Sequence, residues 1–184
     1  FHEYSYDYYK NVYDEFKKRN HIKIFNARIN PTKLIEKFKK ELEKEKKEER
    51  RTKIEKDLQY FEQIAQTHPQ EYTCASLICT YSKTGAWSLY IGNDETATYT
   101  GTVNRLYYEF IKDAYENNYE YADLFGVVGD PQTKYKNLAG IYEYKRKIGG
   151  DYIEFVGEFD LVNKPIWYTV LPILLKIYRS IKKL

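Results

Sequence analysis

The sequence predicts an α/β (α+β) domain in which helices flank a mixed sheet and a helical arm is inserted between two strands. Three observations support this prediction. Segments with the two-residue period of strands alternate with segments that have the period of a helix. Two strands are joined by a hairpin turn and others are separated by helices, so both antiparallel and crossover connections are expected. The stretch 32–67 contains neither glycine nor proline and has a helical pattern throughout.

The first elements follow from capping residues and periodicity. Residues 5–19 predict a helix, because aromatic and apolar side chains recur every three or four positions behind Ser5, a favourable N-cap. The stretch 22–29 alternates isoleucine with polar residues and predicts a strand. Asn30 and Pro31 then begin a second helix, as its N-cap and its first helical residue.

The arm, residues 30–70, has two possible forms. Two apolar seams are separated by the wholly polar segment 43–53, which predicts an antiparallel helical hairpin with its tip near 46–51. The absence of a turn residue fits instead a single helix, about 54 Å long at 1.5 Å per residue. The seams consist of Ile35, Phe38 and Leu42, and of Ile54, Leu58, Phe61 and Ala65.

The remaining elements complete the sheet and its helices. Alternating or β-branched runs predict strands, and apolar residues at helical spacing predict helices. The segment 139–147 fits either a short helix or a turn. Strands are predicted at 72–81, 86–92, 121–129 and 151–161, and helices at 102–117 and at 165–182, the latter bent at Pro172.

Composition limits the classes of function. The chain of 184 residues has a net charge of +3, from 30 Lys and Arg against 27 Asp and Glu, which excludes a general nucleic-acid coat but permits a local basic patch. Cys74 and Cys79 lie five apart on one predicted strand, so we expect them on opposite faces, unbridged, in a reducing cytoplasm. With three scattered histidines, no metal site is expected. The chain has no signal peptide at its start. It lacks methionine altogether, so we expect it to be a fragment.

Few motifs carry chemistry by themselves. We find no catalytic triad, P-loop, strand-linked G-x-G-x-x-G or pyrophosphate loop of acetyl-CoA-dependent acyltransferases. The basic run 145–147 before Gly149 and Gly150 has two interpretations: a site for a phosphate or carboxylate, or an ordinary helix C-terminus. The polar segment 92–105 is a weaker anion site at a helix N-terminus. The apolar, cationic end 166–184 predicts either docking on the core or contact with a membrane surface.

Four consecutive motifs resemble the C-terminal half of the FemABX family, the non-ribosomal aminoacyltransferases that build peptidoglycan interpeptide bridges. The charged arm also resembles that of the longer family members. The motifs are YADLFGVVGD (121–130), GIYEYKRKIGG (140–150), DYIEFVGEFDL (151–161) and NKPIWYTV (163–170).

The resemblance implies an architecture. Family members have two GNAT-like subdomains with a substrate channel between them. Residues 1–29 and 71–184 then form the second subdomain, residues 30–70 form the arm, and the first subdomain is absent from this chain. We therefore expect this chain alone to be inactive as an enzyme.

The resemblance also implies site residues. It places Lys145 at the substrate site, with Tyr99, Arg105 and Tyr142 as further substrate-binding candidates and no assigned catalytic residue. Lys147 and Ile148 depart from the usual family pattern. The cations at the tip of the arm are candidate contacts for tRNA phosphates. These tip cations are Lys46, Lys47, Arg50 and Arg51.

The implied reaction transfers an amino acid from aminoacyl-tRNA to the stem-peptide amine of a lipid-linked or nucleotide-linked peptidoglycan precursor. No cofactor is needed beyond aminoacyl-tRNA as co-substrate, and no metal is expected. The expected location is the cytoplasm, with peripheral contact at the inner face of the plasma membrane. Two alternatives remain: a GNAT-type acyl-CoA-dependent N-acyltransferase, and a non-catalytic binding module.

Overall fold

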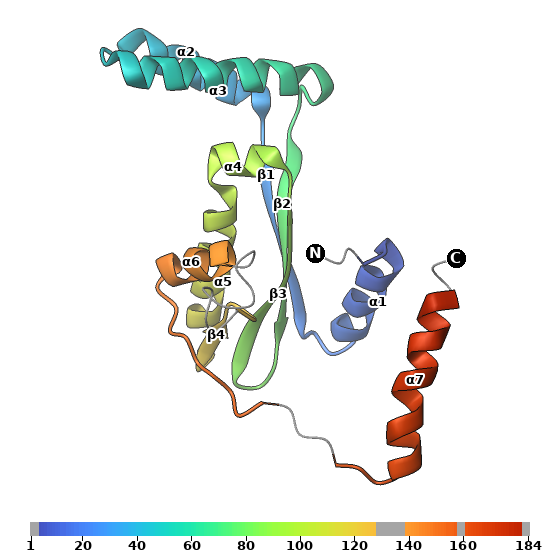
Figure 1. Cartoon of the computed structure of the whole chain (residues 1–184). Helices are drawn as coiled ribbons and strands as arrows, with labels where there is room; N and C mark the ends of the chain where they lie inside the picture. Colours follow the sequence, from blue (N-terminus) through green and yellow to red (C-terminus); the bar gives the residue numbers. More distant parts are fainter. Residues whose placement is uncertain (1–3, 128–138, 158–160, 182–184) are drawn as a thin grey trace.

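A computed structural model of the chain describes residues 4–127, 139–157 and 161–181. Helices flank a four-stranded sheet of order β1-β2-β3-β4, and two of them project from one end of it as an arm (Figure 1). The elements are α1 (Tyr6–Lys17), β1 (Ile22–Ile29), α2 (Pro31–Lys44), α3 (Glu48–Thr67), β2 (Tyr72–Tyr81), β3 (Gly85–Asn93), α4 (Glu95–Thr100), α5 (Thr102–Glu116), β4 (Tyr121–Asp123), α6 (Ala139–Ile148) and α7 (Pro165–Ile181).

The sheet is mixed, as predicted. β1, β2 and β3 are antiparallel neighbours, and β4 pairs with β3 in parallel. Gly85 begins β3 opposite Tyr121 of β4. A Cβ atom at Gly85 would lie 2.4 Å from the Tyr121 ring, so only glycine allows the two strands to meet there.

The core lies between the sheet and α5. Leu106, Phe110 and Ala114 of α5 are buried at helical spacing and belong to the same apolar cluster as Leu77 of β2. Phe61 joins this cluster from α3 with no exposed surface, so the base of the arm is part of the core. On the other side of the sheet, α1 packs through Tyr8, whose hydroxyl lies 2.7 Å from that of Tyr90.

Both cysteines are buried free thiols, but they do not lie on opposite faces as predicted. The pairing register between β1 and β2 shifts after Ala27, and Cys74 is the extra residue of this bulge. Its Sγ lies 3.6 Å from the hydroxyl of Thr102 in α5. Cys79 also faces α5, where burial and, to a smaller extent, the charge of Asp113 raise the pKa of its thiol. A one-residue bulge reverses the side to which the later side chain points.

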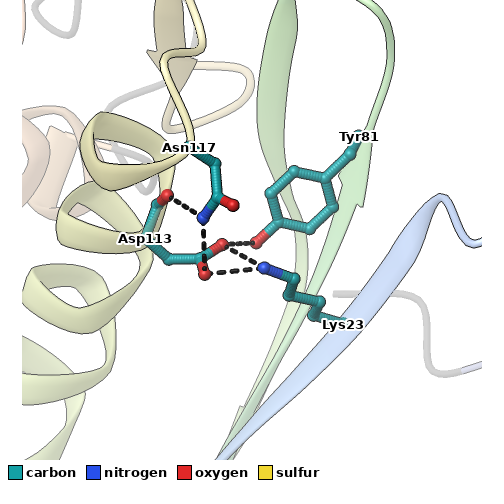
Figure 2. A network of polar contacts seen from close by, with 4 residues as sticks. All are labelled: Lys23, Tyr81, Asp113 and Asn117. Atoms are coloured by element: carbon teal, nitrogen blue, oxygen red, sulfur yellow. Dashed lines mark hydrogen bonds and ion pairs between the residues drawn. The ribbon is translucent and has the colours of Figure 1, made fainter.

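A polar network ties α5 to two strands (Figure 2). The Asp113 carboxylate accepts bonds from Lys23 Nζ of β1 at 2.6 and 2.8 Å and from Tyr81 Oη of β2 at 2.8 Å. Asn117 Nδ2 donates to the same side chain and to the Asp113 carbonyl. Because Tyr81 is only 4% exposed, Asp113 satisfies a hydroxyl that water reaches poorly.

We expect Asp113→Ala to lower the free energy of unfolding by about 1–3 kcal/mol, because it leaves the buried Tyr81 hydroxyl without an acceptor. Urea unfolding of the chain measures this loss. Glu116→Ala is the matched control, since Glu116 lies on the same helix in an exposed ion pair with Lys112 at 3.7 Å. That control is expected to change stability by less than about 0.5 kcal/mol. Equal losses in the two variants would contradict a structural role for the network.

The arm is the antiparallel hairpin, and its tip is Glu45–Lys47, slightly before the predicted 46–51. The turn contains no glycine and is closed by hydrogen bonds from side chains. The Glu45 carboxylate accepts the backbone N–H groups of Lys46 and Lys47, each at 3.0 Å. Arg51 Nη1 donates to the carbonyls of Leu42 at 2.9 Å and Glu45 at 3.1 Å. These bonds satisfy backbone groups that a tight turn would otherwise leave open.

Two predicted strands need correction. The strand predicted at 121–129 ends at Asp123, whose carboxylate accepts the Phe125 N–H at 2.6 Å and where Phe125 then adopts a positive φ of 68°. The segment predicted as a strand at 151–161 is irregular over its described residues 151–157. Phe155 is 79% exposed there. Alternating apolar residues form a stable strand only when a neighbouring strand is available for pairing, and the described residues of this segment have none. Residues 128–129 and 158–160 of these two predictions lie outside the described residues.

Of the two interpretations of 139–147, the helix is correct, as α6. The predicted C-terminal helix is α7, which continues through Pro172. α7 stands away from the sheet (Figure 1), and its large apolar side chains are exposed. At about 100° per residue they cover an arc of roughly 220°, which leaves a narrow polar stripe. This stripe includes Thr169, Lys176 and Ser180.

Candidate functional site

α5 and α6 form the scaffold of the candidate site. The Tyr144 hydroxyl of α6 donates to Asn104 Oδ1 of α5 at 2.7 Å, and the Tyr144 ring lies 5.9 Å from that of Tyr107. Burial raises the pKa of Tyr144 to about 12. The bond fixes the rotation of α6, and with it the direction of the next residue, Lys145.

Lys145 binds the loop that follows β4. Its Nζ donates to the carbonyl oxygens of Phe125 and Gly126, each at 3.0 Å. The side chain is half-buried, and desolvation lowers its pKa while the nearby Asp123 carboxylate opposes that shift. An ammonium group has three N–H donors, so one remains beyond these two bonds.

The end of α6 closes against the same loop. A Cβ atom at Gly150 would meet Leu124 Cδ1 at 3.4 Å and the Lys145 carbonyl oxygen at 3.9 Å. Gly149 ends the helix with a φ of 97°, a conformation that favours glycine. The glycine pair after the basic run therefore serves the helix terminus and the close approach of α6 to the loop.

The other predicted substrate residues divide into two groups. Arg105 follows Asn104 on α5, pairs with Glu109, and places its guanidinium 5.0 Å from the ring centroid of Tyr108. Tyr142 lies on α6, with its ring 6.3 Å from that of Tyr152. Both therefore belong to the same pair of helices as Lys145, and all are exposed or half-buried.

Tyr99 lies elsewhere. It belongs to α4, where its ring stacks on Tyr60 of the arm with a centroid distance of 4.1 Å and an interplanar angle of 16°. The sequence did not show that Tyr99 lies apart from the candidates on α5 and α6, because α4 has no apolar periodicity and was not predicted.

The cations at the tip of the arm differ in their availability. Arg51 is half-buried and occupied by the two carbonyls of the turn, and Arg50 Nε lies 3.1 Å from the Glu45 carboxylate. Lys46 and Lys47 are exposed, and within the described part of the chain their side chains have no ion-pair partner.

A groove on the arm contains a row of lysines that the sequence analysis missed. Its volume is about 470 Å³. The lysines come from α2 at intervals of four, three and four residues, so they share one face of the helix, and this spacing was the available signal. Lys37 lies 3.7 Å from Glu41, and the Glu45 carboxylate is occupied by the backbone N–H groups of the turn and by Arg50. The groove is lined by Lys33, Glu36, Lys37, Lys40, Glu41, Lys44, Glu45, Arg50 and Ile54.

Across residues 4–127, 139–157 and 161–181, no three His, Cys, Asp or Glu side chains gather in a way that could hold a metal ion. Among the same residues, no helix has both the length and the apolar character that crossing a membrane requires.

The fold is that of a FemABX-type protein. The chain belongs to the FemAB family, whose model matches residues 1–176. Its fold is similar to that in the crystal structure of FemX, with a TM-score of 0.64 and 19% identity over 92% of this chain and 49% of that chain. The chain thus spans about half the length of that solved structure. No curated protein matches it. These findings confirm the predicted family and fold class.

Proposed function

We propose that the protein acts in the transfer of an amino acid from aminoacyl-tRNA to the stem-peptide amine of a peptidoglycan precursor, as part of a two-subdomain enzyme. Membership of the FemAB family is the observation that carries this proposal. The position of Lys145 supports it, because a half-buried ammonium with one donor to spare suits an anionic or carbonyl group of a substrate.

The proposed reaction is an aminolysis. The stem-peptide amine attacks the ester carbonyl, a C–N bond forms, and the C–O bond to the tRNA breaks. The amine loses a proton, and the ribose oxygen of the tRNA gains one. Negative charge develops on the carbonyl oxygen in the transition state, and a positioned cation stabilises it. The third donor of Lys145 is our candidate for this role.

The arm is proposed to contact the tRNA through its lysine row, Lys33, Lys37, Lys40 and Lys44. These residues extend over roughly 16 Å of helix, which suits a chain of phosphates better than one isolated phosphate group. Exposed Lys46 and Lys47 extend the row, whereas the internal bonds of Arg51 make it a residue of the turn.

The proposal places the protein in the cytoplasm, where aminoacyl-tRNA is available, and at the inner face of the plasma membrane if the precursor is lipid-linked. The alternative of an acyl-CoA-dependent enzyme has the weaker support, because the sequence lacks the pyrophosphate loop that such enzymes use. A binding module without catalysis is the outcome to be tested.

A transfer assay with the full-length protein, radiolabelled aminoacyl-tRNA and both forms of the precursor tests this function. We expect label on the precursor with the full-length protein and none with the 184-residue chain alone, because the channel is proposed to need two subdomains. Turnover by the chain alone would overturn the two-subdomain argument. No transfer by the full-length protein to either precursor would favour the binding module.

A further inference from the structure

The junction between arm and sheet is closed by polar bonds as well as apolar contacts. The arm leaves the sheet at Pro31, which is buried, and returns to it at Tyr72. The hydroxyl of Thr32 donates to the Pro69 carbonyl at 2.7 Å and ties these two ends of the arm together. The arm therefore moves, if at all, as one body about this junction.

Thr96 of α4 lies at the centre of the junction. Its side chain is 1% exposed, and its hydroxyl lies 2.7 Å from Tyr72 Oη and 3.1 Å from Tyr60 Oη. A hydroxyl has one proton and two lone pairs, so Thr96 serves both tyrosines at once. Tyr60 belongs to the arm and also stacks on Tyr99, so α4 holds it by its ring and by its hydroxyl.

α4 is in turn fixed to the body of the protein. The Asp94 side chain caps the helix by accepting the Ala97 N–H at 3.2 Å, and the Asp94 N–H donates to the Cys74 carbonyl of β2 at 3.0 Å. The Thr100 hydroxyl donates to the Thr96 carbonyl at 2.9 Å and lies 3.3 Å from the Thr102 hydroxyl, at the start of α5. The bond from Tyr60 of the arm to Thr96 therefore connects the arm, through α4, to α5, which carries part of the candidate site.

We propose that Thr96 is a positioning residue that holds the arm at a fixed angle to the sheet and α5. The consequence for catalysis rests on the proposed function: an RNA bound along the lysine row presents its aminoacyl end to Lys145 only at one arm angle. The holding role itself does not require that function. The alternative is that the buried Phe61 alone anchors the arm, and the experiment distinguishes the two.

Spin labels on Glu49→Cys near the arm tip and Tyr115→Cys on α5 report the arm angle as a distance distribution by pulsed electron spin resonance. Both positions are exposed, whereas Cys74 and Cys79 are 2% and 0% exposed and escape labelling. The arm is about 30 Å long, so a change of roughly 10° moves its tip by roughly 5 Å, which the method resolves.

In this doubly labelled protein, Thr96→Val removes the hydroxyl with little change in shape, and Thr96→Ser retains it. We expect the valine variant to broaden or shift the distribution by roughly 5 Å or more, while the serine variant keeps the parent distribution. If the valine variant does not fold, Tyr60→Phe replaces it, because it removes one bond and preserves the ring stack. An unchanged distribution in a folded valine or phenylalanine variant would overturn the proposal.

In the full-length enzyme, Thr96→Val is expected to raise the KM for aminoacyl-tRNA about tenfold with an unchanged KM for the precursor. A changed distance distribution with an unchanged KM for aminoacyl-tRNA would contradict the role of Thr96 in positioning RNA. Absence of transfer by the unmodified enzyme would instead contradict the proposed function, and the distance distribution would still decide whether Thr96 holds the arm.

Discussion

Lys145→Ala in the full-length enzyme is expected to slow transfer by about a hundredfold or more, which corresponds to about 2.7 kcal/mol of barrier. The variant removes the donor proposed to face the developing oxyanion. It also releases the carbonyls of Phe125 and Gly126, which the ammonium holds at 3.0 Å each. The free energy of unfolding is therefore expected to fall as well, by about 1.5–3 kcal/mol, as for bonds to a charged group.

Two further variants separate these roles. Lys147→Ala is the control for charge, because Lys147 lies on the same helix, is exposed, and has no ion-pair partner within the described residues. It should leave both transfer and stability near their normal values. Lys145→Arg retains the charge and can still bond the loop, so we expect it to recover most of the stability. A stable arginine variant with slow transfer would show that Lys145 does more than hold the loop, whereas normal transfer by Lys145→Ala would contradict its oxyanion role.

Replacement of Lys37, Lys40 and Lys44 by glutamine is expected to weaken binding of tRNA to the full-length protein by roughly a hundredfold at low salt. Each lysine that contacts a phosphate contributes about one unit to the slope of log affinity against log salt concentration, so the slope should fall by about three. Filter binding or fluorescence anisotropy with unfractionated tRNA over a salt series measures both quantities.

The matched control replaces Lys39, Lys53 and Lys56, which lie on the same arm outside the groove. Both variants lose three charges, so a general electrostatic effect would weaken binding equally in the two. Equal weakening would contradict a specific tRNA contact at the lysine row. If neither variant weakens binding, the arm does not bind tRNA. Thermal unfolding confirms that the arm is intact in each.

The arm shows what its sequence could predict and what it could not. Its two seams repeat at helical spacing because the facing helices bury them, so a hairpin was foreseeable from residues such as Phe38 and Phe61. The position of the turn was predicted only approximately, because Glu45 and Arg51 close it with side-chain bonds that have no fixed residue signature. A glycine would have been a local signal, whereas these bonds appear only once the two helices lie side by side.

The candidate site was predictable to a smaller extent. The motif around Lys145 identified the family, and the role of Lys145 stays a prediction. The hydrogen-bond partners of Lys145 lie 19 and 20 residues upstream and are backbone carbonyls. A pattern of side chains contains no information on which carbonyl a lysine will meet. The strand prediction over 151–157 was wrong for a related reason. The alternation of apolar and polar residues is a local pattern, whereas strand pairing depends on a neighbouring strand from the rest of the fold.

The exposure of α7 gives this protein a built-in optical reporter. Of the two tryptophans, Trp167 on α7 is 61% exposed, whereas Trp87 of β3 packs edge-on against Tyr121 with a centroid distance of 5.5 Å. Their emission should therefore separate into a long-wavelength component, open to a neutral quencher such as acrylamide, and a more shielded one. Trp167→Phe assigns the first component. Any surface that covers α7 will shift that component to shorter wavelength, so its contacts can be followed by titration without a label.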